Sequence, residues 1–260
     1  MNEIESMSKT LSVVLATYNE EKNLVDCLNS FKDIASEFVV VDGDSKDKTV
    51  EIAKNFGAKV KITTNKPIFH INKQMAIDMA TKDWVLQLDA DERGTPELRK
   101  EIVSAINSSK DINGYWIPRK NWFLGRFLMK GGQYPDYTLR LYRRGKGRLP
   151  QISVHEQAVV EGKVDYLKNP LIHIADPNFG RYIKRWSRYV DLIVKELEEK
   201  KTGYNPFIAV KYLFILPLWW FLLTYIRHKG FMDGWQGFVF SFFSSLRFPV
   251  SYLRYIIAKI

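Results

Sequence analysis

Short apolar runs alternate with amphipathic segments along the first 108 residues. The runs LSVVLA (11–16), EFVVVD (37–42), KVKIT (59–63) and DWVLQLD (83–89) have the length and composition of strands buried on both faces. Helical patterns occur at 20–31, 47–56, 70–80 and 96–107. This alternation predicts an α/β fold with a mainly parallel sheet covered by helices.

Local signals support two of the helix ends. Gly57 is placed to end the second helix in a left-handed conformation, and Thr95 with Pro96 has the usual order of an N-cap and a first helical residue. The single cysteine, Cys27, excludes an internal disulfide and fits a reducing compartment. We interpret it as a structural residue of the first helix.

The pattern changes after residue 108. Residues 110–175 contain short strand-like stretches and predict a mixed, partly antiparallel extension, whereas 179–197 is an amphipathic helix with apolar residues at spacings of three and four. From Tyr212 to Ile226 no residue is charged, and a second apolar run covers 234–246. A bilayer crossing needs about 20 residues. We therefore expect re-entrant or interfacial helices first, a spanning hairpin second, and two buried core helices third.

Charge narrows the choice of partners. The chain of 260 residues has a formal net charge of +10, which favours nucleic acid, acidic phospholipid or phosphorylated small molecules. Many basic residues of the last third flank the apolar segments, as expected at a surface of anionic lipids. No nucleic-acid-binding module is recognisable, so no nucleic-acid partner is expected. The polar start MNEIESMSKT is not followed by a long apolar segment, and we expect no signal peptide.

Acidic residues follow the fourth predicted strand. Asp89, Asp91 and Glu92 come directly after its apolar residues. Ligands of open parallel sheets bind beyond the carboxyl ends of the strands, and two carboxylates one residue apart are able to hold Mg²⁺ or Mn²⁺ beside a diphosphate. The alternative is an acidic turn before the helix at Thr95.

Two other strand ends carry polar residues. Thr17, Tyr18 and Glu20 follow the first strand and Asp42 ends the second. A tyrosine is able to stack on a nucleotide base and an acid to accept from a base imide or a ribose; a turn with a helix cap explains the same residues nearly as well. Arg140, in LRLYRR, is either a phosphate ligand or part of a surface salt bridge.

These segments together resemble family 2 glycosyltransferases of the nucleotide-diphosphosugar transferase (GT-A) fold. The resemblance rests on SVVLATYNEEKNL, VVVDGDSKDKT, INKQMAIDMATKDWVLQLDADE, RLYRR and VHE, and it covers about the first 175 residues. More narrowly, the chain is similar to small bacterial enzymes that add a sugar to the lipopolysaccharide inner core or related glycolipids.

The resemblance implies a division of the chain. Residues 1–175 form the catalytic domain, with a nucleotide-binding half (1–108) and an acceptor-side half (109–175). An amphipathic helix (176–203) and apolar membrane-associated helices (204–260) follow.

The resemblance also implies roles for single residues. Tyr18 and Asp42 hold the base, usually uracil, with support from Thr17 and Glu20. Asn72 and Lys73 contact the diphosphate or the uridine. Asp89 contacts the ribose or the metal, and Asp91 is the principal metal ligand.

The reaction of the family is an inverting displacement, which needs a base for the acceptor hydroxyl. Here Val154-His155-Glu156 replaces the commoner acidic pair. We expect Glu156 to be the base, with Asp136 in reserve. His155 is a candidate metal ligand and His173 a second one, although a single histidine is more often structural.

The expected function is transfer of a sugar from a nucleoside diphosphate, with UDP as the first expectation, to a lipopolysaccharide core or other glycolipid. The expected location is the cytoplasmic face of the inner membrane, where the chain is peripheral or re-entrant. A polyprenyl-phosphate acceptor is the alternative reaction. A catalytically silent membrane-bound binding protein is the alternative class.

Overall fold

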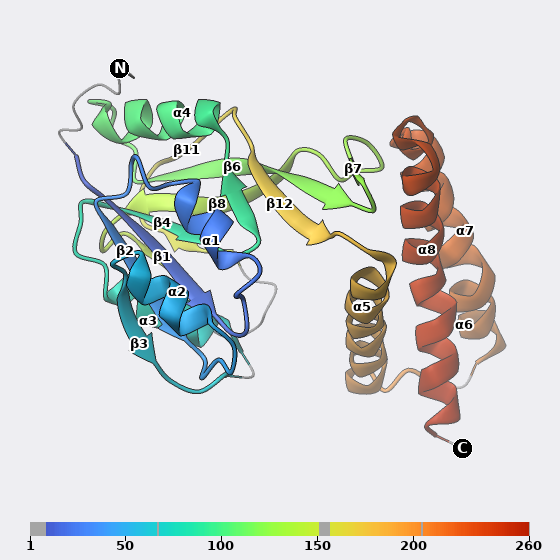
Figure 1. The fold of residues 1–260 in the computed structure, drawn as a ribbon. Coiled ribbons are helices and arrows are strands. Elements are labelled where there is room, and N and C mark those ends of the chain that lie inside the picture. The colour runs from blue at the N-terminus through green and yellow to red at the C-terminus, as the bar shows by residue number, and fades with distance from the viewer. Residues whose placement is uncertain (1–8, 67, 151–156, 204, 260) are drawn as a thin grey trace. The chain divides into compact units, whose positions relative to one another are not determined.

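The computed structural model describes residues 9–66, 68–150, 157–203 and 205–259. The chain forms two compact units. The first consists of Met1–Arg119 with Asp136–His173, and the second of Lys120–Pro135 with Ile174–Ile260. The first unit holds the sheet and its covering helices, and the second holds the long amphipathic and apolar helices (Figure 1).

A ten-stranded mixed sheet organises the first unit, with the main strand order β3-β2-β1-β4-β8-β6-β12-β5. In chain order these strands are β1 (Leu11–Thr17), β2 (Glu37–Asp42), β3 (Lys59–Ile62), β4 (Trp84–Leu88), β5 (Glu92–Gly94), β6 (Gly114–Phe123), β8 (Asp136–Arg143) and β12 (Leu171–Asp176). β7 (Arg126–Phe127) and β11 (Val164–Tyr166) pair with β6, while β9 (Gly147–Arg148) and β10 (Val159–Val160) form a separate hairpin. β6 and β12 end in the second unit.

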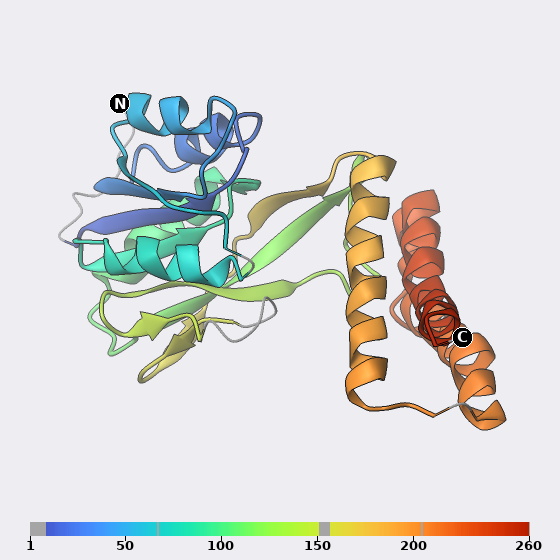
Figure 2. The same ribbon diagram turned by 90° about the horizontal axis from the view of Figure 1, so that it is seen from below.

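The predicted parallel half of the sheet is confirmed. β1 pairs in parallel with β2 and β4, and β2 pairs in parallel with β3. β8 then runs antiparallel to β4, and β6 antiparallel to β8, which is the mixed extension expected after residue 108 (Figure 2).

Helices cover both faces of the parallel half. Alternate residues of β1 point to opposite sides, so Leu11, Val13 and Leu15 pack in one core and Val14 in the other. The first core includes residues of α1 (Leu24–Asn29), α2 (Thr49–Asn55) and α4 (Pro96–Asn107), and the second includes α3 (His70–Asp78). Cys27 is buried in the first core, as expected of a structural cysteine.

Two local predictions were wrong and two are confirmed. β3 is an exposed edge strand and not a strand buried on both faces, because it stands at the end of the strand order, beside β2, among the residues that the structure describes. α1 begins at Leu24 and not near residue 20, since residues 20–23 form a turn in which Asn23 N donates to Glu20 O at 3.0 Å. Thr95 caps α4 by accepting from Leu98 N at 3.1 Å, and Gly57 has a φ of +73° after α2.

The second unit is mainly helical. Its helices are α5 (Phe179–Glu199), α6 (Pro206–Val210), α7 (Leu216–Phe221) and α8 (Gly234–Ile257), with π-helical turns at Lys211–Ile215 and Leu222–Arg227 and a 3₁₀ turn at Gly230–Asp233. The segment Pro206–Arg227 is thus helical throughout and, at 22 residues, is long and apolar enough to cross a membrane. The predicted run at 234–246 belongs to the longer helix α8. Residues 120–135 pack in this unit.

Candidate active site

The carboxyl ends of three parallel strands meet at one edge of the sheet. Thr17, the last residue of β1, pairs with Asp42, the last residue of β2. Leu15 pairs with Leu88 of β4, so Asp89 follows at the same edge. The parallel register therefore brings together polar residues that lie far apart in the chain.

Asp42 organises the first part of this edge. Its side chain is fully buried and accepts hydrogen bonds from Thr17 Oγ1, Ser45 N and Ser45 Oγ, each at 2.7 Å. The carboxylate thus ties the end of β1 to the loop after β2. Of the predicted base-binding residues, Thr17 and Asp42 are in direct contact.

The neighbouring loop is held in an unusual backbone conformation. Asn19 has a φ of 55° and Asp44 a φ of 69°. Asn19 N donates to Ser45 Oγ at 2.8 Å, and Lys46 N donates to Asn19 Oδ1 at 2.8 Å. Asn and Asp tolerate this left-handed conformation, and the hydrogen bonds hold the loop in one shape.

Tyr18 and Glu20 differ in their surroundings. Tyr18 is 44 % exposed beside this loop, which leaves its ring accessible to a flat ligand. Glu20 accepts from Asn23 Nδ2 at 2.8 Å, and its backbone N donates to Thr49 Oγ1 at 2.7 Å. Glu20 therefore supports the loop and the start of α1, and its predicted part in holding the base stays a prediction.

Asp89 lies between two cations. Its Oδ1 forms an ion pair with the Lys73 ammonium, and its Oδ2 lies 2.6 Å from Arg140 Nη2. Burial acts to raise the pKa of Asp89, but Arg140 and Lys73 outweigh this and hold the pKa well below its ordinary value. Asp89 is ionised, and any metal ion there would share its oxygens with these cations.

Asn72 and Lys73 enter the site from α3. Both are almost fully buried; Asn72 Nδ2 donates to Thr64 O at 3.0 Å, and the Lys73 ammonium lies 4.7 Å from the centre of the Phe69 ring. Burial lowers the pKa of Lys73, and Asp89 opposes this shift. Lys73 is therefore a buried side chain paired with Asp89 and not a solvated helix lysine.

A β-bulge directs Arg140 into the site. Tyr115 of β6 pairs with Leu141 and Trp116 with Leu139, which leaves Arg140 as the extra residue of β8. Its guanidinium donates to Gln87 Oε1 and Asp89 Oδ2 at 2.6 Å each, and to Glu92 Oε1 at 3.1 Å. Arg140 is 8 % exposed, so these contacts are buried and do not form a surface salt bridge.

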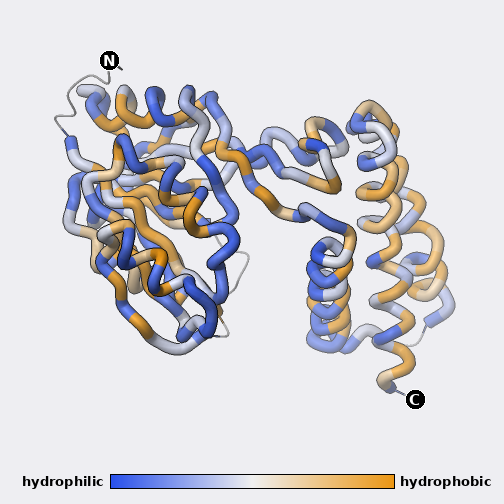
Figure 3. Tube along the Cα trace, in the orientation of Figure 1, coloured by the Kyte–Doolittle hydropathy of each residue, from blue (hydrophilic) through white to orange (hydrophobic). Residues whose placement is uncertain are grey.

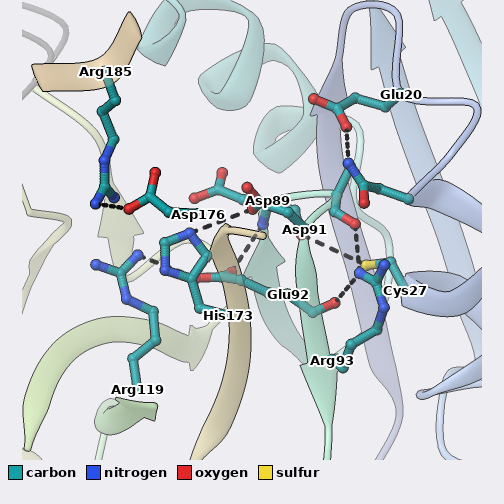
Figure 4. Close-up of polar contacts among 12 residues, drawn as sticks. Glu20, Cys27, Asp89, Asp91, Glu92, Arg93, Arg119, His173, Asp176 and Arg185 are labelled. Atoms are coloured by element: carbon teal, nitrogen blue, oxygen red, sulfur yellow. Dashed lines mark hydrogen bonds and ion pairs between the residues drawn. The ribbon is translucent and has the colours of Figure 1, made fainter. Parts of the chain in front are cut away.

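Glu92 and Arg119 belong to the site although the sequence did not single them out as site residues. Glu92 is fully buried; it accepts from Asp89 N at 2.9 Å and, besides Arg140, from Arg119 Nη1 at 3.4 Å (Figure 4). Arg119 also donates to Asp136 Oδ2 from Nε at 3.0 Å and Nη2 at 2.7 Å. Positive and negative groups thus alternate from Lys73 to Asp136. Glu92 stood next to the predicted acids, whereas no sequence signal pointed to Arg119.

Asp91 and His173 form a second pair of polar side chains in the site. The pairing of β5 with β12 puts His173 opposite Glu92, and His173 Nε2 lies 3.6 Å from Asp91 Oδ1 (Figure 4). In the part of the chain that the structure describes, no three His, Cys, Asp or Glu side chains converge as a metal site. Mg²⁺ at phosphate sites normally takes one or two protein ligands and completes its shell with phosphate oxygens and water. The pair fits a cation bound jointly with a diphosphate.

The predicted catalytic bases have different outcomes. Glu156 and the candidate ligand His155 lie outside the described residues. Asp136, the reserve base, begins β8 with a side chain that is 34 % exposed and held by Arg119.

Comparisons with known proteins identify the family. The model described as Glycosyl transferase family 2 matches residues 12–159. An uncharacterized glycosyltransferase of Rickettsia typhi is 29% identical over 244 residues, covering 89% of this chain and 81% of the relative. The lipopolysaccharide core biosynthesis glycosyltransferase LpsC of Rhizobium meliloti is 28% identical over 256 residues, covering 91% of each. Among solved structures, S. aureus TarS 1–349 has a TM-score of 0.49 at 17% identity, covering 94% of this chain and 91% of TarS.

The matched region contains the strand-end residues Thr17, Asp42 and Asp89 and also Asp91 and Arg140, and it extends over more than half of the chain. This chain therefore belongs to glycosyl transferase family 2 and is a glycosyltransferase of the GT-A fold.

Proposed function

We propose that the enzyme transfers a sugar, with inversion, from a nucleoside diphosphate to a lipopolysaccharide core or related glycolipid. The observation that carries the proposal is the edge at which Thr17, Asp42 and Asp89 meet, with Asp91 two residues further on. Such an edge offers polar side chains for a nucleoside beside carboxylates for a cation.

Our first candidate for the donor is a UDP-sugar. The buried Asp42, fixed by Thr17 and Ser45, is an acceptor for a base imide or ribose hydroxyl, and the exposed ring of Tyr18 is a stacking partner for the base. Asn72 and Lys73 of α3 are our candidates for contacts to the diphosphate or the uridine, and Lys73 is paired with Asp89. Arg140 keeps Asp89 ionised there.

Asp91 and His173 are the described residues that would hold Mg²⁺ or Mn²⁺. When bound, such a cation neutralises charge on the leaving diphosphate. Asp89 contributes through the network of Lys73 and Arg140, which fixes the loop that carries Asp91. Glu92 supports the same loop by accepting from Asp89 N.

The acceptor proton needs a carboxylate on the acceptor side. Glu156 is our first candidate from the sequence. Of the described residues Asp136 is the candidate, because its side chain is part-exposed and Arg119 orients one of its oxygens by two hydrogen bonds. A base held in one rotamer is prepared for the proton that it removes.

The relation to LpsC and the apolar helix Pro206–Arg227 favour a lipid-linked acceptor. We place catalysis in residues 1–175 and membrane association in residues 204–260, joined by the amphipathic segment 176–203, at the cytoplasmic face of the inner membrane. Product analysis separates the two acceptor classes. A sugar-phosphate ester, cleaved by mild acid, would indicate polyprenyl phosphate, and an acid-stable glycosidic linkage supports a glycolipid.

The donor and the cation are tested together. We expect one member of a panel of nucleotide sugars to be consumed in the presence of Mg²⁺ or Mn²⁺ and spared when EDTA is present. Asp91→Asn should lower this turnover at least about 100-fold, the order of loss expected when a group stabilising transition-state charge is removed. Asp111→Asn, an exposed acid outside the site, is the matched control. Full metal-dependent turnover by Asp91→Asn would refute the proposed cation site.

A further inference from the structure

We propose that the second unit binds a bilayer of anionic lipids in the plane of its surface. The outer face of the helical segment Pro206–Arg227 inserts among the lipids, α5 stays in water, and the segment does not cross the bilayer. This inference rests on the proposed membrane location and specifies its geometry.

Length alone leaves both geometries open. The segment has 22 residues, which corresponds to about 33 Å of helix at 1.5 Å per residue. That length is close to the thickness of the hydrocarbon core. Packing against the neighbouring helices therefore has to decide between crossing and lying flat.

One face of the segment is apolar and exposed. Its exposed large residues recur every three or four positions, as on one side of a helix: Phe207, Val210, Phe214, Ile215, Leu218, Trp219, Leu222 and Ile226. Phe207 is 84 % exposed and Phe214 67 %. Exposed Trp235 and Phe238 at the start of α8 add to the apolar surface. An apolar surface of this extent is typical of an interaction site.

The opposite face is attached closely to α8. Trp220 Nε1 donates to Ser244 Oγ at 3.1 Å, and the rings of Tyr212 and Tyr252 stack with centroids 5.5 Å apart. A Cβ added at Gly237 would lie 1.9 Å from Gly230 O, so the turn before α8 also packs without a gap. The apolar segment and α8 therefore enter the bilayer as one unit or remain outside it as one unit.

α8 in turn is attached to α5. Trp186 Nε1 donates to Phe243 O at 2.5 Å, Ser251 Oγ donates to Val190 O at 3.2 Å, and Arg254 forms an ion pair with Asp191 at 2.8 Å. In two perpendicular views α8 lies between α5 and α6–α7 (Figures 1 and 2). The helical unit thus has an α5 side and an α6–α7 side.

The α5 side is charged. Figure 3 shows hydrophilic positions along α5, in contrast to the mostly apolar α7. The exposed charged residues of α5 are Lys184, Arg188, Asp191, Lys195, Glu196, Glu198 and Glu199. A crossing orientation would carry these residues into the hydrocarbon core, where ionised side chains are strongly disfavoured. An orientation in the plane of the surface leaves them in water.

Charge identifies the lipid class. From Pro206 to Lys259 the sequence contains a single acidic residue, Asp233. Its side chain is 2 % exposed and accepts from Lys130 N at 2.7 Å. Lys211, inside the apolar segment one turn from its start, and Arg227 and Lys229, at its end, are exposed. Basic groups beside an inserted apolar face are complementary to anionic headgroups.

A labelling experiment distinguishes the two geometries. The native Cys27 is buried, so Lys200→Cys and His228→Cys, at exposed positions before and after the segment, provide single reporters. Each variant of the full chain is floated with phosphatidylethanolamine–phosphatidylglycerol vesicles and treated with a membrane-impermeant maleimide. We expect both reporters to react fully from the outside. Protection of either one until detergent is added would overturn the in-plane geometry.

Paired substitutions test which face inserts. Leu218→Asp, at a position 62 % exposed on the outer face, should weaken partitioning into these vesicles at least about tenfold, because a charge replaces the leucine that inserts among the lipids. Leu192→Asp, at a position 39 % exposed on α5, should change it less than about twofold. Equal effects of the two substitutions, or binding to phosphatidylcholine vesicles as strong as to anionic ones, would overturn the proposal.

The outcome is separable from that of the proposed reaction. Metal-dependent consumption of the nucleotide sugar is measured on the same Leu218→Asp protein in detergent, with circular dichroism as the check on folding. Retained turnover with lost vesicle binding supports the membrane proposal. Normal vesicle binding without turnover by the unmodified enzyme refutes only the reaction.

Discussion

Arg140 Nη2 lies 2.6 Å from Asp89 Oδ2 and 3.1 Å from Glu92 Oε1, so one guanidinium pairs with the part-exposed Asp89 and the fully buried Glu92. Asp89 directly follows β4, and Glu92 is the first residue of β5. The acid-rich turn between them therefore has its shape set by a residue from β8. Asp91, the proposed metal ligand, lies in this turn.

Replacing Arg140 should destabilise the protein. Arg140→Met leaves Asp89 and Glu92 without this guanidinium, and loss of one partner of a buried charge cluster typically costs about 3–5 kcal/mol. We expect a loss of that order in the free energy of unfolding, measured by urea denaturation. Arg148→Met, at an exposed position of β9, is the control and should cost less than about 0.5 kcal/mol. Comparable losses in both variants would argue against the buried network.

His173→Ala should weaken the response to metal. His173 Nε2 lies 3.6 Å from Asp91 Oδ1, close enough to join it as a ligand or to orient it. We expect the Mn²⁺ concentration for half-maximal activity to rise at least about tenfold, the lower end of the effect of losing a group that supports a metal site. His228→Ala, at an exposed position, serves for comparison. An unchanged metal titration would remove His173 from the site.

Stability at acidic pH should depend on Glu37. Its carboxylate accepts from Ser12 Oγ at 2.5 Å, from Lys59 Nζ at 2.7 Å and from Thr81 N at 2.6 Å. Burial acts to raise the pKa of Glu37, but these hydrogen bonds outweigh it and lower the pKa from 4.5 to about 2. Because the folded pKa is depressed, the stabilisation is complete above about pH 5 and is lost as the pH falls toward 2.

Glu37→Gln tests this dependence. The variant should be about 1.5–3 kcal/mol less stable than the parent near pH 7, the range for hydrogen bonds to a charged group, and the difference should shrink on acidification. Denaturation at a series of pH values measures the difference in the free energy of unfolding. Glu51→Gln, at an exposed position of α2, is the control. A difference that does not vary with pH would show that Glu37 does not titrate as described.

Strands β6, β8 and β11 carry three neighbouring rings, Trp116, Tyr137 and Tyr166. Trp116 and Tyr166 are stacked at 6.1 Å between centroids, and Tyr137 meets Tyr166 edge-on at 4.9 Å. Tyr166 is 56 % exposed, and Tyr137 directly follows Asp136. Exposed aromatic faces are suitable surfaces for the apolar faces of pyranose rings.

Tyr166→Ala should therefore raise the KM for the acceptor. Loss of one ring contact, about 1 kcal/mol, corresponds to a factor of about five, while the KM for the donor stays unchanged. Tyr166→Phe should behave as the parent enzyme, and Tyr189→Ala, an exposed tyrosine of α5, is the remote control. An effect confined to the donor KM would contradict an acceptor role for these rings.

The edge where the strands end was predictable because it depends on local pattern and on one rule of sheet geometry. Apolar runs of strand length ended in Thr17, Asp42 and Asp89, and parallel pairing places such ends at one edge. The helix beginning at Thr95 was predictable for a similar reason, since its cap lies within a few residues of the bonds that it makes. The residue motifs also indicated the family that the comparison with known proteins confirmed.

The partners of these residues were decided only by tertiary structure. Arg119 of β6 contacts Glu92, and His173 of β12 lies close to Asp91. The antiparallel pairing of β6 with β8 and of β12 with β5 has no local signature in the sequence. The bulge that directs Arg140 to Asp89 likewise appears only when β6 and β8 are aligned. In the helical unit, hydropathy located an uncharged run at 212–226, and the structure shows that the helical apolar segment is longer and covers Pro206–Arg227. Its attachment through α8 to the charged helix α5 is what determines which face is available to a membrane, because hydropathy describes each helix alone and not its neighbours.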